Sequence, residues 1–201
     1  MTTAPSTGAA TAAASGGGAV AAYTLEDLAP RLEALHEASF HWALTCAKGV
    51  REEAEDVLQT AYQKVVDGRS TFDGRSEFKT WLFAIIWRTA ADRRRRRAWR
   101  RALLGRWIDD ARSESREATS PLHRLEASER AERVRRALAT LSERQHQVLD
   151  LVFYHEHSIR QAAEVLGLRL GTARVHYQRG KAALSERLRR DERRSNWSHV
   201  D

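Results

Sequence analysis

The chain has little cysteine, little proline and no pattern of alternating polar and apolar residues typical of strands. Its 201 residues include one cysteine, Cys46, and three prolines. A single cysteine excludes an intramolecular disulfide and a zinc site built on cysteines. Cys46 stands close to Trp42 in a segment with helical spacing, which predicts a small buried residue in a helix. The pattern as a whole predicts an all-α protein.

The chain also lacks a long apolar run. No stretch approaches the ~20 apolar residues that a bilayer-spanning helix needs, so we expect no membrane insertion. The N-terminus has neither a basic region nor a leucine-rich one, so it does not resemble a secretory signal. We therefore expect a cytoplasmic protein.

Positive charge is what the chain has in excess. It carries 34 Lys and Arg against 27 Asp and Glu, a formal net charge of +7. A basic balance favours a polyanionic partner but says nothing about the fold.

Composition divides the chain into five parts. Residues 1–22 are rich in Ala, Gly, Ser and Thr, and are expected to be a disordered tail because they can bury little apolar surface. Residues 23–101 form a first helical domain, with helices at 24–48, 51–66 and 78–101 and a loop at 67–77. Pro30 is expected in the first turn of the longer helix in 24–48. Residues 102–122 read as a flexible linker, residues 123–190 as a second helical domain, and residues 191–201 as a tail that frays.

The stretch Ser158–Lys181 has the pattern of a helix-turn-helix. Ser158 and Gln161 have capping-box spacing, Gly167 can end the first helix, and Thr172 is a plausible N-cap of the second. Between residues 169 and 190 there are seven Lys and Arg against one Glu, so the second helix can reach phosphates and base edges in a major groove. The alternative is an ordinary helical hairpin with a solvated basic face.

The first domain contains an acidic helix, an isolated aromatic and an arginine run. Four acidic residues crowd the first turns of helix 51–66, which by composition alone is a well-capped surface helix. Phe72 stands alone in a polar loop, where it either enters the core or is displayed. Seven arginines occur within residues 93–101, and charge of this density requires a counter-surface, for which phosphate is the natural candidate.

Together these motifs resemble bacterial RNA polymerase sigma factors of the extracytoplasmic-function (ECF) group. The first match runs from EDVLQTAYQKVV through FDGRSEFKTWLFAII to the arginine run. The second runs from ALATLSERQHQVLDL to the end of the helix-turn-helix. Two motifs in the right order are more specific than either alone. The resemblance implies two all-α domains, called region two and region four, on a flexible linker.

The resemblance also implies partners and site residues. The partners would be the RNA polymerase core (its β′ and β subunits) and promoter DNA, and an anti-sigma factor would fit as a further partner. It implies no catalytic residue, no cofactor and no metal. The residues that it places at the core polymerase are Asp56 and Gln59. Those at the minus-ten element are Phe72, Arg88, Arg93, Arg94, Arg95, Arg96 and Arg97. Phe72 would hold a flipped-out base, and Trp81 would form the floor of the pocket. Those at the minus-thirty-five element are Thr172, Arg174, Val175, His176, Gln178, Arg179 and Lys181.

The sequence departs from the family pattern at informative positions. Arg88 stands where the family usually has Asn, and Arg offers only donors where Asn offers a donor and an acceptor. Val175 and His176 replace the usual Ser and Arg, and Val175 could contact a thymine methyl. We therefore expect a non-standard promoter sequence.

Two alternatives to a sigma factor are a helix-turn-helix regulator and an enzyme. A helix-turn-helix regulator that does not bind polymerase would explain Ser158–Lys181 but neither the acidic helix nor the Phe72 loop. An enzyme is disfavoured because the chain has no glycine-rich phosphate loop and no nucleophile elbow. His155 and His157, with His146 nearby, could indicate a metal site, but positions i and i+2 do not share a helix face, so none is expected.

Overall fold

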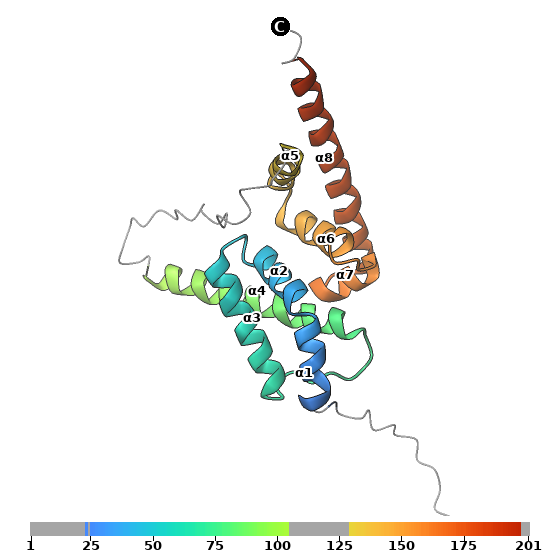
Figure 1. Ribbon diagram of the computed structural model, residues 1–201. Helices are drawn as coiled ribbons and strands as arrows, with labels where there is room; N and C mark the ends of the chain where they lie inside the picture. Colours follow the sequence, from blue (N-terminus) through green and yellow to red (C-terminus); the bar gives the residue numbers. More distant parts are fainter. Residues whose placement is uncertain (1–22, 24, 105–128, 198–201) are drawn as a thin grey trace, which may run out of the picture.

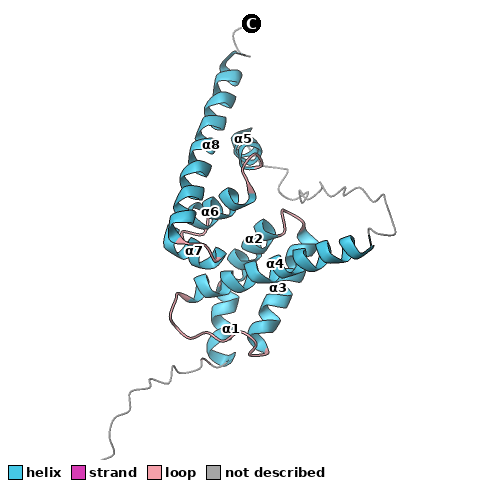
Figure 2. Cartoon of the chain, turned by 180° about the vertical axis from the view of Figure 1, so that it is seen from behind, coloured by secondary structure: helices cyan, strands magenta, loops and turns pink. Residues whose placement is uncertain are grey.

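The computed structural model describes residues 23, 25–104 and 129–197 (Figure 1). Within these ranges every regular element is a helix, which confirms the predicted all-α class (Figure 2). The predicted N-terminal tail, most of the linker and the last four residues lie outside the described residues. None of the described helices is both long enough and apolar enough to cross a membrane.

The first four helices form an N-terminal unit. They are α1 (Leu25–Ala34), α2 (His36–Cys46), α3 (Arg51–Val66) and α4 (Phe78–Leu104). The bounds of α3 and the loop before α4 agree with the prediction. The single longer helix predicted after Pro30 is wrong, because the chain turns at Leu35 and Pro30 lies inside α1. Leu28 and Leu32 of α1 are buried, so packing on the unit outweighs the cost of an interior proline.

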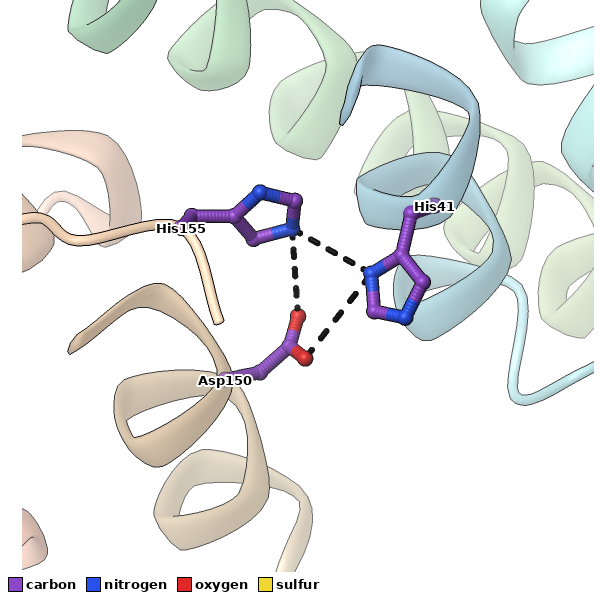
Figure 3. Close-up of side chains that lie close together, drawn as sticks. All are labelled: His41, Asp150 and His155. Atoms are coloured by element: carbon purple, nitrogen blue, oxygen red, sulfur yellow. Dashed lines mark hydrogen bonds and ion pairs between the residues drawn. The ribbon is translucent and has the colours of Figure 1, made fainter. Parts of the chain in front are cut away.

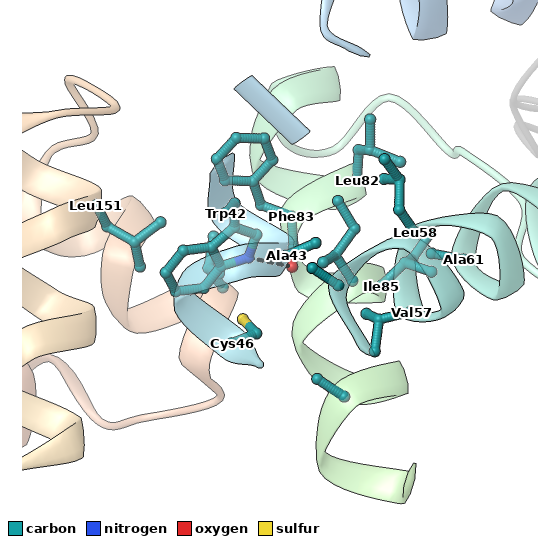
Figure 4. Packing of buried hydrophobic residues seen from close by; sticks show 14 of the residues in the cluster. Trp42, Ala43, Cys46, Val57, Leu58, Ala61, Leu82, Phe83, Ile85 and Leu151 are labelled. Atoms are coloured by element: carbon teal, nitrogen blue, oxygen red, sulfur yellow. Dashed lines mark hydrogen bonds between the residues drawn. The ribbon is translucent and has the colours of Figure 1, made fainter. Parts of the chain in front are cut away.

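Trp42 lies in the core between Phe83 and Leu151 (Figure 4). Its side chain is fully buried, its ring stacks on Phe83 of α4, and its Nε1 donates a hydrogen bond of 3.0 Å to the Phe83 carbonyl. Cys46, one turn further along α2, is 1% exposed, which confirms the predicted buried cysteine. Gly49 then ends this segment with a φ of 86°, a conformation that favours glycine.

The last four helices form a C-terminal unit. They are α5 (Glu129–Leu138), α6 (Glu143–Phe153), α7 (Ile159–Leu166) and α8 (Leu170–Trp197). Complete capping boxes begin α6 at Ser142 and α7 at Ser158, and the second confirms the prediction from the spacing of Ser158 and Gln161. The helix α8 continues to Trp197, although a fraying tail was predicted from residue 191 onward.

The two units lie against each other, an arrangement that we call closed. The helix α7 packs on α4, and α6 packs on α2 (Figure 1). The apolar core is continuous across the contact, since Trp42 and Phe83 belong to the same cluster as Leu151, Val165 and Leu166 (Figure 4). The C-terminal unit is therefore packed on the N-terminal unit, and the seam between them contains both apolar and polar groups.

Candidate nucleic-acid and polymerase-binding surfaces

The second helix of the helix-turn-helix presents its polar side to solvent. Gly167 ends α7 in the left-handed region with a φ of 61°, and its N–H bonds back to the Glu164 carbonyl at 3.2 Å. Ala162 and Ala173 are fully buried where α7 crosses α8, because small side chains allow the two helices to approach closely. The helix-turn-helix prediction agrees with this geometry.

The residues expected at the minus-thirty-five element share the outer face of the first turns of α8. His176 is half-buried, and the others are exposed, namely Thr172, Arg174, Val175, Gln178, Arg179 and Lys181. Val175 is 46% exposed, which is unusual for a large apolar residue on a charged face. The prediction of Thr172 as N-cap is wrong, because α8 begins at Leu170 and the first turn closes from Ala173 N–H to the Arg169 carbonyl at 3.0 Å.

The acidic helix α3 faces the arginine run of α4. The Asp56 side chain is 56% exposed and accepts a hydrogen bond of 2.5 Å from Arg93 Nη2. One turn before it, Glu53 Oε2 lies 2.7 Å from Arg97 Nη1. Gln59 is exposed one turn after Asp56. Part of the counter-surface that the arginine run requires is therefore α3 itself.

The other arginines of the run have different surroundings. Arg94 Nη1 donates to the Cys46 carbonyl at 2.7 Å, and its Nη2 lies 3.3 Å from Glu143 Oε1 on α6, so Arg94 joins the two units. Arg95 pairs with Asp92 one turn earlier. Arg96 is exposed, as is Arg88 two turns earlier in the helix.

Phe72 enters the core and is not displayed. Its side chain is 6% exposed, and its ring contacts Tyr23, Phe78 and Trp81 at centroid distances of 5.0, 5.3 and 5.2 Å. Trp81 is half-buried beside it. The loop residue and the helix residue expected to form the minus-ten pocket are thus adjacent, with Phe72 closing the space between the loop and α4.

The seam between the units brings together three polar residues that the sequence did not connect (Figure 3). His41 of α2, Asp150 of α6 and His155 of the following loop point toward one another. Burial raises the pKa of Asp150 to about 7 and lowers the pKa of His155 to about 3, and burial also lowers the pKa of His41. All three shifts favour the uncharged forms, and the one hydrogen bond within the group joins His41 Nδ1 and His155 Nε2 at 3.3 Å.

The sequence predicts His155 as part of a helix. The helix α6 ends at Phe153, and Glu156 has a φ of 58°, so His155 and His157 lie in a loop to which helix-face spacing does not apply. Both side chains turn inward and are less than 5% exposed. His41 is 114 residues away from His155, and nothing in the sequence pairs them.

Each of the two units matches a known protein family. Residues 33–100 match Sigma-70 region 2, and residues 131–184 match Sigma-70, region 4. These matches correspond to the N-terminal unit and to the C-terminal unit with its helix-turn-helix, and together they define a sigma factor of RNA polymerase.

Individual relatives narrow the family further. The chain is 32% identical over 143 residues to the ECF RNA polymerase sigma factor SigF of Caulobacter vibrioides, an alignment that covers 71% of this chain and 74% of that protein. It is 27% identical over 139 residues to the ECF RNA polymerase sigma factor SigX of Bacillus subtilis, covering 69% and 72%. The chain belongs to the ECF group of the sigma-70 family.

Solved structures show the same fold. The sigma factor RpoE in complex with the anti-sigma factor NepR from Bartonella quintana superposes with a TM-score of 0.62 at 22% identity, over 82% of this chain and 98% of that one. CnrH in complex with the cytosolic domain of CnrY gives a TM-score of 0.56 at 22% identity, over 84% and 91%.

Proposed function

We propose that this sigma factor reads a minus-thirty-five element with the first turns of α8. The support is the exposed face described above, where Arg174, Gln178 and Arg179 offer donors to base edges and phosphates, and Val175 offers an apolar contact to a thymine methyl. A helix held at its N-terminal end by a packed partner helix is the usual major-groove reader. Because Val175 and His176 differ from the family pattern, the preferred sequence differs too.

The core polymerase contact is assigned to Asp56 and Gln59 on α3. The exposed carboxylate and amide lie one turn apart on the same face of the helix. Asp56 already pairs with Arg93, so a basic or polar partner would compete with that arginine. Such a pair is partly exposed and contributes little stability, about 0.2–1 kcal/mol, so a partner can displace it.

The minus-ten contact is assigned to Phe72, Arg88 and the run Arg93–Arg97. Capture of an extruded base compensates for the few kcal/mol per base lost on unstacking. Since Phe72 is buried, it can hold a base only after the loop between α3 and α4 moves and uncovers its ring. The exposed Arg88, Arg95 and Arg96 need no such movement to reach phosphates.

The closed arrangement must open for both elements to be bound at once. Elements centred near minus ten and minus thirty-five lie about 25 base pairs apart, or roughly 85 Å along B-form DNA. In the closed arrangement α7 touches α4, so the two DNA-binding units are adjacent. Binding to core polymerase would hold the units at the larger separation.

The protein is proposed to act by binding and not by catalysis, and to act in the cytoplasm with the polymerase. An anti-sigma factor is a proposed further partner. The two solved relatives named above are each in complex with another protein, and an anti-sigma factor here would act by covering α3 or by stabilising the closed arrangement.

The deciding experiment is binding to cognate core polymerase on a sizing column without DNA. We expect co-elution of the full chain and its loss on Asp56→Arg combined with Gln59→Ala. Glu37→Arg is the matched control, because it makes the same charge change at an exposed position of α2. Failure of the folded wild-type chain to co-elute would favour the alternative, a helix-turn-helix regulator that does not bind polymerase.

A further inference from the structure

We propose that His41, Asp150 and His155 bind a divalent transition-metal ion of the zinc class at the seam between the two units (Figure 3). The three residues come from different elements: α2 of the N-terminal unit, α6 of the C-terminal unit, and the loop that joins α6 to α7. A metal bound here would therefore connect two independently named sigma regions.

The spacing of the donor atoms fits one tetrahedral ion. His41 Nδ1 lies 3.3 Å from His155 Nε2, His155 Nε2 lies 3.6 Å from Asp150 Oδ2, and His41 Nδ1 lies 3.9 Å from Asp150 Oδ1. Ligands at zinc bond lengths with tetrahedral angles stand about 3.3–3.5 Å apart. These distances use both Asp150 oxygens; one ligand atom from each residue can be chosen so that all three lie within 4.8 Å of one another. Side-chain rotation would have to bring these three atoms to the tetrahedral spacing, and the fourth position is left for water.

The surroundings hold the three side chains in place. The His41 ring stacks on Tyr154 at a centroid distance of 3.7 Å, and the His155 ring meets the edge of Phe83 at 4.8 Å. The Thr45 hydroxyl donates to the Asp150 carboxylate. Such supporting contacts fix the orientation of metal ligands.

The cluster also has a polar atom without a hydrogen bond. The Asp150 side chain is 10% exposed, and its Oδ2 accepts no hydrogen bond from any residue that the structure describes. Oδ2 lies toward His155 Nε2, and the other oxygen, Oδ1, lies toward His41 Nδ1 (Figure 3). A buried carboxylate whose two oxygens face two imidazoles gains a partner when a cation is bound among them.

Two imidazoles and one carboxylate favour a borderline ion over calcium or magnesium, which prefer all-oxygen sites. Because its ligands come from both units, the ion would stabilise the closed arrangement. On the proposed function, it would then oppose the opening that core polymerase requires, so metal availability would regulate initiation.

The first test measures metal binding and does not involve polymerase. The full chain, stripped with chelator, is dialysed against Zn²⁺, and bound zinc is measured by elemental analysis. Co²⁺ is then used as a probe, because its visible absorption reports four-coordinate geometry. We expect one ion per chain and an affinity that falls at least about tenfold in His41→Gln and in Asp150→Asn.

His36→Gln is the matched control, because it changes an exposed histidine of the same helix and should leave the affinity unchanged. Asp150→Asn keeps the side-chain volume, and circular dichroism shows whether each variant is folded. The proposal is overturned if the wild-type chain takes up no zinc, or if folded His41→Gln and Asp150→Asn bind as tightly as the wild type.

The second test separates metal binding from the sigma function. Co-elution with core polymerase is measured with chelator and with Zn²⁺. We expect zinc to weaken co-elution of the wild type but not of Asp150→Asn. Co-elution in chelator with no effect of zinc would overturn the regulatory role while leaving the proposed sigma function intact.

Discussion

Glu143 is the charged residue that most directly connects the two units, so its replacement tests the closed arrangement. Its Oε1 lies 3.3 Å from Arg94 Nη2, and its Oε2 lies 3.4 Å from Lys48 Nζ. Both cations belong to the N-terminal unit. We expect Glu143→Gln, which removes the charge and keeps the shape, to favour opening.

The exposures of Glu143, Arg94 and Lys48 determine how strongly Glu143→Gln should shift the chain toward the open arrangement. The side chains are 41% exposed for Glu143, 30% for Arg94 and 65% for Lys48. Partly exposed pairs contribute about 0.2–1 kcal/mol each, with the less exposed Arg94 pair near the upper value. Their sum of about 1–1.4 kcal/mol corresponds to a five- to tenfold decrease in the closed-to-open equilibrium constant.

Energy transfer between two fluorescent labels on the full chain measures this equilibrium. One label is attached to an engineered cysteine at Gln63 of α3 and the other at Arg189 of α8, since both positions are exposed and Cys46 is buried. The readout is the concentration of urea, below unfolding, at which transfer is lost.

Glu143 also lies in the first turn of α6, where its charge complements the helix dipole. A double-mutant cycle with Arg94→Met removes that contribution, because it is the same in both arms. We expect a coupling energy of about 0.5–1 kcal/mol that falls in high salt. A coupling below about 0.2 kcal/mol would refute the assigned role of the pair.

Three further predictions concern other parts of the chain. A Cβ on Gly180 of α8 would lie 3.1–3.3 Å from side-chain atoms of α6, whereas a Cβ on Gly171 of the same helix would meet nothing within 4 Å. In urea unfolding, Gly171→Ala should therefore stabilise the chain by up to about 1 kcal/mol, and Gly180→Ala should destabilise it by about 1 kcal/mol. Equal stabilisation by both substitutions would contradict this packing. Arg174→Ala and Arg179→Ala should each weaken minus-thirty-five binding by about 1–3 kcal/mol in a gel-shift assay, and full binding by both variants would remove the recognition-helix assignment. Burial, with a smaller contribution from a nearby lysine, lowers the pKa of His157 to about 4. As the pH falls, this histidine is therefore protonated near pH 6.5 in the unfolded chain but only near pH 4 in the folded chain. The contribution of His157 to the free energy of unfolding should fall by about 2–3 kcal/mol between pH 6.5 and pH 4. Acid unfolding followed by circular dichroism should show a correspondingly smaller loss of stability in His157→Phe.

Local features of this chain could be predicted from the sequence because they depend on neighbouring residues. The capping boxes at Ser142 and Ser158 and the left-handed Gly167 are local backbone events, and all three are present. The break at Leu35 was missed because helical spacing continues through it. It depends on how α1 packs on the rest of the N-terminal unit.

The seam could not be predicted in the same way. His41 is more than 100 residues from Asp150 and His155 and belongs to none of the quoted motifs, and nothing in the motif that contains Asp150 pairs it with His41. The positions expected to bind polymerase and DNA follow from the resemblance to sigma factors, which indicates the residues that face a partner. It does not say what those residues contact in the free chain.

Those internal contacts imply that partner binding and closure compete. Arg94 is a proposed DNA ligand, yet in the closed arrangement its guanidinium is shared between the Cys46 carbonyl and Glu143. A phosphate that takes this guanidinium must release Glu143, so minus-ten binding by the arginine run weakens the hold of the N-terminal unit on α6. By linkage the effect is reciprocal, and an open chain must bind the same phosphate more tightly than a closed one. Asp56 and Arg93 couple the proposed polymerase contact to DNA within the N-terminal unit, because a partner that binds Asp56 frees Arg93 for DNA. Core binding and promoter binding should therefore each favour the other even where the two ligands do not touch.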